Sequence, residues 1–173
     1  MAYPNIELQP TQRAFTQLRE LSYWLALSSL AKVETVLSLS MILASIYVVA
    51  ADFEEPARFI FQNDILIALG QGFVGVIAGS LGICAFYSKL NHQRLMDIHC
   101  LSCLATVGIG ILLLVHSSFG KIRLYYTIDW CAFLLFVMAA VSSVLLDISC
   151  IFSIFLTCLN YCANRASSRT VIV

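Results

Sequence analysis

The stretch Ile65–Ser88, ILIALGQGFVGVIAGSLGICAFYS, decides the fold, because it contains 24 consecutive residues without a charged side chain. A helix needs about 20 apolar residues to cross a hydrocarbon core of about 30 Å, so this stretch is long enough to span a membrane. Its apolar residues are continuous rather than alternating, which favours a helix and argues against a transmembrane β-strand. The sequence therefore predicts one membrane-spanning helix here.

Three further stretches of similar character predict spans on either side of it. With the first stretch they give four spans, at about 33–52, 65–88, 98–119 and 130–159. The connections are short, so consecutive spans must run antiparallel. We expect an all-α, integral membrane four-helix up-and-down bundle over residues 33–162.

The segments outside the bundle are short. Residues 1–32 form a predicted cytosolic N-terminal segment, and residues 163–173 a predicted short cytosolic tail. The apolar run Leu21–Ala31 has only 11 residues and is flanked by charges, which favours an amphipathic helix at the membrane interface. A first span that starts nearer Leu21, as part of one long helix, is the alternative.

The composition excludes most other classes of protein. Hydrophobic residues make up 60% of the 173 residues, charged residues 12%, and the mean hydropathy is +0.88. Soluble domains carry about 25% charged residues, so this chain has too little charge to cover a water-facing surface. Disorder requires low hydrophobicity and high charge. The formal net charge of zero argues against nucleic acid as a partner.

The positions of the basic residues predict the orientation. With the N-terminus inside, seven of the ten Lys and Arg residues lie on the cytosolic side, which follows the positive-inside rule. We therefore expect both termini to lie in the cytosol. The membrane that the chain spans is expected to be the plasma membrane or an endomembrane. The exceptions on the outer side are Arg58, Lys121 and Arg123.

The second span carries a row of glycines suited to helix packing. Gly72, Gly75, Gly79 and Gly82 recur at steps of three, four and three residues, which places them on one helical face. Small residues let helix backbones approach closely inside a bilayer. This face is predicted to pack against another span of the same chain or, as the alternative, against another membrane protein or a second copy of the chain.

Two polar side chains lie within the apolar runs. Gln71 needs a partner inside the bundle, because an unpaired amide in lipid is costly. Asp147 is the one acidic residue within the run of the fourth span, and an intramembrane carboxylate is a candidate functional site. Counting from Trp130 places it about 26 Å in, near the cytosolic boundary. A structural role is the favoured interpretation, either at the membrane interface or beside a partner such as Lys32, Lys89 or Arg94, and a proton or ion role is the alternative.

The seven cysteines are expected to be reduced or acylated rather than disulfide-bonded. Five lie near cytosolic span ends, where S-palmitoylation is common. These are Cys84, Cys100, Cys103, Cys158 and Cys162. His99, Cys100 and Cys103 also suggest a redox CxxC pair or a zinc site with His92, but inert apolar packing is favoured, and no cofactor or metal is predicted.

Short motifs carry a family resemblance over roughly 32–162. Lys32-Val33-Glu34, the segment 72–83 (GFVGVIAGSLGI) and Leu146-Asp147 followed by Cys158-x-x-x-Cys162 resemble the span motifs of the membrane-spanning four-domains family, the group of the B-lymphocyte surface antigen and the IgE-receptor beta chain. The resemblance implies an oligomeric tetraspan, with no enzymatic activity, that associates with receptors or modulates calcium entry. Asp147 stands where the family has Glu.

The function expected from these features is a non-enzymatic multi-pass membrane scaffold, or a receptor- or channel-associated tetraspan, that acts through helix–helix association. Its partners would be membrane lipids, other membrane proteins and further copies of itself. The alternative is an oligomeric ion channel or a calcium-linked channel modulator. The sequence contains no Ser-His-Asp set, phosphate loop or HExxH motif, so no catalytic residue is predicted.

Overall fold

The structure is a computed structural model that describes residues 10–50, 55–88, 91–116 and 130–170. Within these residues the chain is all-α. It forms four helices, α1 (Pro10–Ala50), α2 (Glu55–Tyr87), α3 (His92–His116) and α4 (Trp130–Thr170). The predicted fold class is confirmed.

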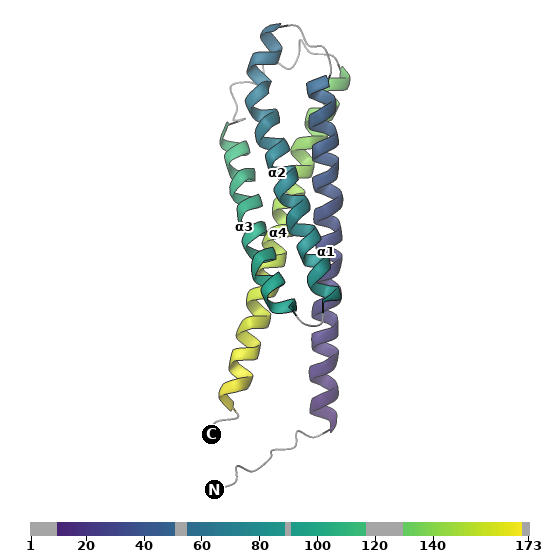
Figure 1. Ribbon diagram of the computed structural model, residues 1–173, viewed down its shortest axis with the longest axis vertical. Helices are drawn as coiled ribbons and strands as arrows, with labels where there is room; N and C mark the ends of the chain where they lie inside the picture. The colour runs from purple at the N-terminus through teal and green to yellow at the C-terminus, as the bar shows by residue number, and fades with distance from the viewer. Residues whose placement is uncertain (1–9, 51–54, 89–90, 117–129, 171–173) are drawn as a thin grey trace.

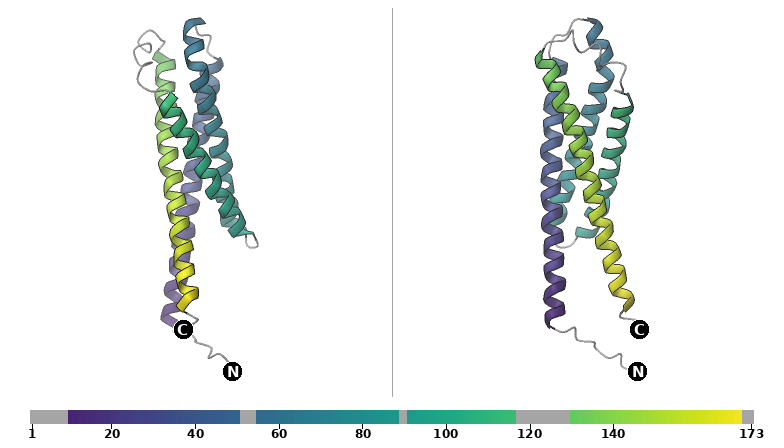
Figure 2. Two further views of the ribbon diagram at one scale, coloured as in Figure 1. Left: turned by 90° about the vertical axis from the view of Figure 1, so that its left-hand side faces the viewer. Right: turned by 180° about the vertical axis from the view of Figure 1, so that it is seen from behind.

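The helices stand side by side and alternate in direction (Figure 1). Each of α1 and α3 packs against both α2 and α4, whereas α2 and α4 barely touch. The first turn of α1 and the last turn of α4 lie at the same end of the bundle, beyond the last turn of α2 and the first turn of α3 (Figures 1 and 2). We call this end the terminal end and the opposite one the far end.

Each helix contains a segment long and apolar enough to cross a membrane. These segments are Gln17–Ala50, Asp64–Tyr87, His92–His116 and Val137–Ala163. The four helices support the expectation of a multi-pass transmembrane protein.

The N-terminal half of α1 differs from the expected separate interfacial helix. The chain from Pro10 to Ala50 is one continuous helix, and it contains neither glycine nor a second proline that would break it. Leu27 is fully buried, and it packs with Ala85 of α2 and Met96 of α3. The run Leu21–Ala31 is therefore part of the bundle, because this contact buries one side of it.

The second helix also begins earlier than the predicted span. It starts at Glu55, so most of the expected loop before Ile65 is helical. Pro56 does not oppose this, because proline is well suited to the first turn of a helix, where backbone N–H groups have no intrahelical partner. The C-terminal tail is likewise helical as far as Thr170.

The glycine row of α2 faces α1. A Cβ atom added at Gly72 would lie 2.7 Å from Cγ1 of Ile42, and one at Gly79 would lie 2.7 Å from the backbone oxygen of Ala31. At Gly75 the added atom would collide with the hydroxyl of Ser38. The backbones of α1 and α2 are thus as close as glycine allows, and the row serves packing within the chain.

We expect substitution of this row to destabilise the bundle. Gly79→Ala places a methyl group against the α1 backbone, and overpacking of this kind costs about 1–3 kcal/mol. Gly70→Ala is the matched control on the same helix, because an atom added there has nothing within 4 Å. Thermal unfolding in detergent should show a lower midpoint for Gly79→Ala only. Equal midpoints for the two variants would contradict the packing.

Candidate functional site

The centre of the bundle contains a first polar cluster formed by Gln71, Ser143 and Asp147. The side-chain amide of Gln71 donates to Oδ1 of Asp147 over 2.9 Å, and its carbonyl oxygen accepts from the Ser143 hydroxyl over 2.7 Å. Gln71 is fully buried and Asp147 is 8% exposed. Each of the two polar groups singled out in the sequence is therefore a partner of the other.

This arrangement changes the expectation for Asp147. Its carboxylate accepts a hydrogen bond from an amide on α2, whereas the sequence suggested the membrane interface or a lysine or arginine partner. Asp147 also packs against Gly110 of α3, where an added Cβ atom would collide with its carboxylate. The cluster thus joins α2 and α4 through their side chains and fits α3 around them.

A second polar cluster lies nearer the terminal end and is formed by Glu34, His99 and Cys103. All three side chains are fully buried, and one ligand atom of each lies within 4.8 Å of the others. The thiol of Cys103 is 3.7 Å from Nε2 of His99 and 4.0 Å from Oε2 of Glu34. A carboxylate, an imidazole and a thiol therefore meet between α1 and α3.

Neighbouring groups hold two members of the second cluster in place. The hydroxyl of Ser153 on α4 donates to Oε1 of Glu34 over 2.6 Å. Nδ1 of His99 lies 2.8 Å from the backbone oxygen of Ala78 on α2. Gly82 makes room for the imidazole, because an added Cβ atom would lie 3.0 Å from its Cε1. All four helices contribute to this site.

The sequence identified part of this cluster but missed Glu34. The CxxC interpretation grouped His99 with both cysteines and with His92, whereas the structure places only His99 and Cys103 of these in the cluster of described residues. From the sequence, Glu34 is expected at the start of a span, at the membrane interface. In the structure α1 continues through this position, so Glu34 lies inside the bundle. The signal for this continuity is the absence of glycine and of an internal proline between Pro10 and Ala50.

A third polar contact lies at the far end. Asp64, which is 1% exposed, approaches Nδ1 of His116 to 2.6 Å, and the contact joins the start of the second span to the end of α3. The His116 side chain is 41% exposed. The Asp64–His116 contact and the two clusters thus lie at three levels along the bundle.

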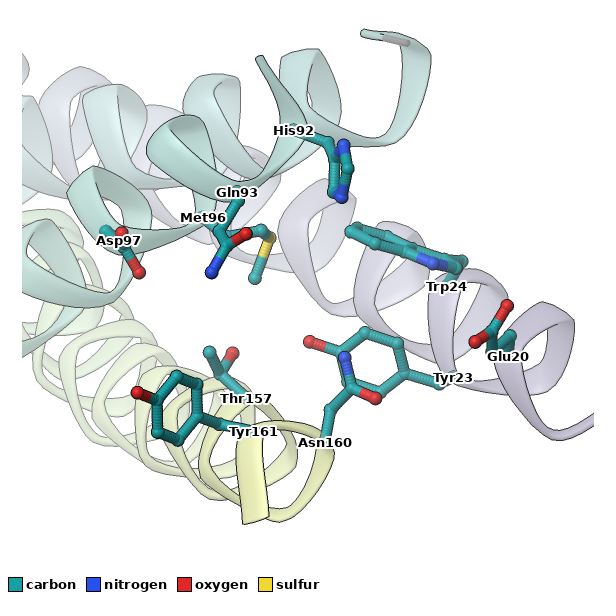
Figure 3. Close-up of a pocket in the computed structure, with 10 residues that line it drawn as sticks. All are labelled: Glu20, Tyr23, Trp24, His92, Gln93, Met96, Asp97, Thr157, Asn160 and Tyr161. Carbon is teal, nitrogen blue, oxygen red and sulfur yellow. The ribbon is translucent and has the colours of Figure 1, made fainter. Parts of the chain in front are cut away.

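A cavity of about 560 Å³ opens at the terminal end between α1, α3 and α4 (Figure 3). Trp24 stands edge-on to Tyr23 and to His92, with ring centroids 5.2 and 5.8 Å apart. Glu20 and Asp97 bring carboxylates to the same cavity. Its wall is therefore aromatic and acidic, which suits a cation.

The cysteines differ in their access to the surface. Cys84, Cys158 and Cys162 are exposed, Cys100 is partly exposed, and Cys103 and Cys150 are buried. A lipid chain can reach the exposed thiols of the folded chain but not that of Cys103. The set of acylation candidates is thereby reduced to the accessible cysteines.

Comparison with known proteins gave no match to a protein-family model, to a curated protein or to a solved structure.

We expect Gln71 and Asp147 to be energetically coupled. Gln71→Leu leaves the Asp147 carboxylate and the Ser143 hydroxyl without this partner, and an unsatisfied buried polar group costs about 1–3 kcal/mol. Adding Asp147→Leu removes the charge that was left unpaired, so the double variant should be more stable than the sum of the single effects by about 0.5–2 kcal/mol. Unfolding in mixed micelles measures this cycle, and strict additivity would contradict the contact.

Proposed function

We propose that this chain is a non-enzymatic multi-pass membrane protein that acts by associating with other membrane proteins, including copies of itself, through its outer helix surface. The observation that carries this proposal is that the buried polar side chains of the interior are paired within the chain. Among the described residues, the buried side-chain nitrogen and oxygen atoms have hydrogen-bond partners within the chain, with the hydroxyl of Ser149 as the one exception. Such an interior stabilises a bundle and leaves the outer surface for interaction.

The outer surface of α3 is the favoured region for that association. Only 22% of its membrane-span window is buried, the smallest share among the four helices. Leu101, Leu104, Gly108 and Leu112 recur along it at helical spacing and are exposed. We call these residues the α3 outer face. Gly108 has open space around it, which lets a second backbone approach, as small residues do between membrane helices.

The glycine row of α2 is a poor candidate for the same role. Its residues already pack against α1, so an external partner would have to displace that helix. The proposal therefore moves the association surface expected from the sequence to α3. The family resemblance implies a tetraspan whose partners are receptors or channels. We keep both the tetraspan arrangement and this kind of partner in the proposal.

The association is tested by placing bulk on the α3 outer face. Gly108→Leu should weaken self-association without unfolding the chain, because the added side chain points into open space. Gly70→Leu is the matched control, since a Cβ atom added at Gly70 on α2 also has nothing within 4 Å. Energy transfer between labelled chains in liposomes should fall for Gly108→Leu and stay at the wild-type level for Gly70→Leu.

Two results would contradict the proposal. The first is wild-type chain that stays monomeric at all lipid dilutions and recovers no membrane protein on purification from native membranes. The second is cation flux in liposomes containing the purified chain, which would favour the alternative function of an oligomeric channel.

We also propose that both termini face the cytosol and that exposed cysteines at the terminal end are acylated. The orientation is supported by the positive-inside rule, because it places seven of the ten Lys and Arg residues on the cytosolic side of the membrane. Cys158 and Cys162 are exposed on α4 near that end. A membrane-impermeant maleimide should label them in intact cells only after permeabilisation and removal of thioesters by hydroxylamine. Labelling of Cys158 or Cys162 in untreated intact cells would reverse the orientation.

A further inference from the structure

We propose that Glu34, His99 and Cys103 form a binding site for a divalent transition-metal ion of the zinc type. This inference concerns the bundle interior and is independent of the proposed association through α3. It depends on the kinds of ligand atom present, on their distances, and on the groups that hold them.

The ligand atoms suit such an ion. Zinc is bound in proteins by cysteine sulfur at about 2.3 Å and by histidine nitrogen or carboxylate oxygen at about 2.0–2.2 Å. Around a tetrahedral ion these bond lengths separate a sulfur from a nitrogen or oxygen ligand by about 3.5 Å. The thiol of Cys103 is 3.7 Å from Nε2 of His99, 3.8 Å from its Nδ1 and 4.0 Å from Oε2 of Glu34, and the ligand atoms of all three lie within 4.8 Å of one another. Binding of an ion would therefore draw the three side chains together and turn Nε2 toward it.

The same distances are long for hydrogen bonds. The contacts of the Cys103 thiol stand near the outer limit for a sulfur donor, and a thiol is a weak donor. Hydrogen bonding alone therefore explains poorly why a thiol lies between an imidazole and a carboxylate. A metal ion bonded to all three would account for the convergence.

The groups behind the ligands are those that a metal site requires. Metal-binding histidines usually donate their second ring N–H to a carbonyl or carboxylate, which fixes the tautomer. Nδ1 of His99 lies 2.8 Å from the Ala78 backbone oxygen, and this contact leaves Nε2 free to bind the ion. Ser153 donates to Oε1 of Glu34 and leaves Oε2 toward the thiol. Both outer partners come from helices other than those of the ligands.

A second thiol and an acidic cavity lie near the site. Cys150 of α4 is fully buried and packs in the same cluster of buried residues as Cys103. The cavity at the terminal end is lined by Met96, which lies one helical turn before His99 (Figure 3) and packs with the buried Leu27 and Ala85. The carboxylates of Glu20 and Asp97 at this cavity would attract a cation toward the site.

The experiment uses the purified full-length chain in detergent, first stripped with a chelator and then titrated with Co²⁺ and, in parallel, with Zn²⁺. Binding of Co²⁺ should produce a thiolate-to-cobalt charge-transfer band and the d–d absorption of a tetrahedral ion. One equivalent of Zn²⁺ should abolish both. Metal analysis after gel filtration should give one ion per chain.

Matched variants assign the ligands. Cys103→Ser should remove the charge-transfer band, whereas Cys100→Ser on the same helix should retain it. His99→Asn should lose the d–d absorption, whereas His92→Asn should keep it. Ser153→Ala removes only an outer partner and should lower the metal affinity by about 10–100-fold.

The proposal is overturned if folded, monodisperse wild-type chain takes up neither ion. It is also overturned if Cys103→Ser and His99→Asn, folded as judged by gel filtration, bind as the wild type does, or if the Cys100 and His92 variants lose binding equally. Because the wild-type result alone decides whether an ion binds, a variant that fails to fold does not leave the question open.

Discussion

The close contact between α1 and the glycine row of α2 is the constraint on which the rest of the bundle depends. Lipid tails are as apolar as leucine, so burial of apolar surface does not by itself bring membrane helices together. Close backbone packing can, and Gly72, Gly75 and Gly79 allow it along several turns. Once α1 and α2 are fixed, Glu34 points toward α3 and α4 and Gln71 points toward α4, as their contacts show.

The polar clusters then determine how α3 and α4 are added. Asp147 pairs with Gln71 and fills the space beside Gly110, whereas Ser153 reaches Glu34 and His99 reaches the α2 backbone. Each contact fixes the rotation and height of a helix, because a polar group in this setting has few alternative partners. Close packing at the glycine row thus fixes α1 against α2, and the polar contacts place α3 and α4 against this pair.

Most of the fold could be predicted from the sequence, since the apolar runs set the number and length of the spans. The continuity of α1 could not, because the charges around Leu21–Ala31 resembled the edge of a membrane, whereas the helix continues through them. The same charges concealed the burial of Glu34. Gln71 and Asp147 were recognised as unusual, but their pairing depends on how α2 and α4 face each other, and a single sequence does not contain that information.

Glu34 contributes both to the packing of the bundle and to the second polar cluster. A buried carboxylate is costly unless its charge is compensated, and the carboxylate of Glu34 accepts from the hydroxyl of Ser153 and contacts the thiol of Cys103. Serine and cysteine solvate a negative charge without neutralising it. The charge can be balanced by a proton or by a cation. A proton on Glu34, or on the imidazole of His99 within 4.8 Å of it, would balance the charge, whereas a divalent ion would bind the carboxylate, the imidazole and the thiol together. The arrangement of all three side chains therefore favours the ion.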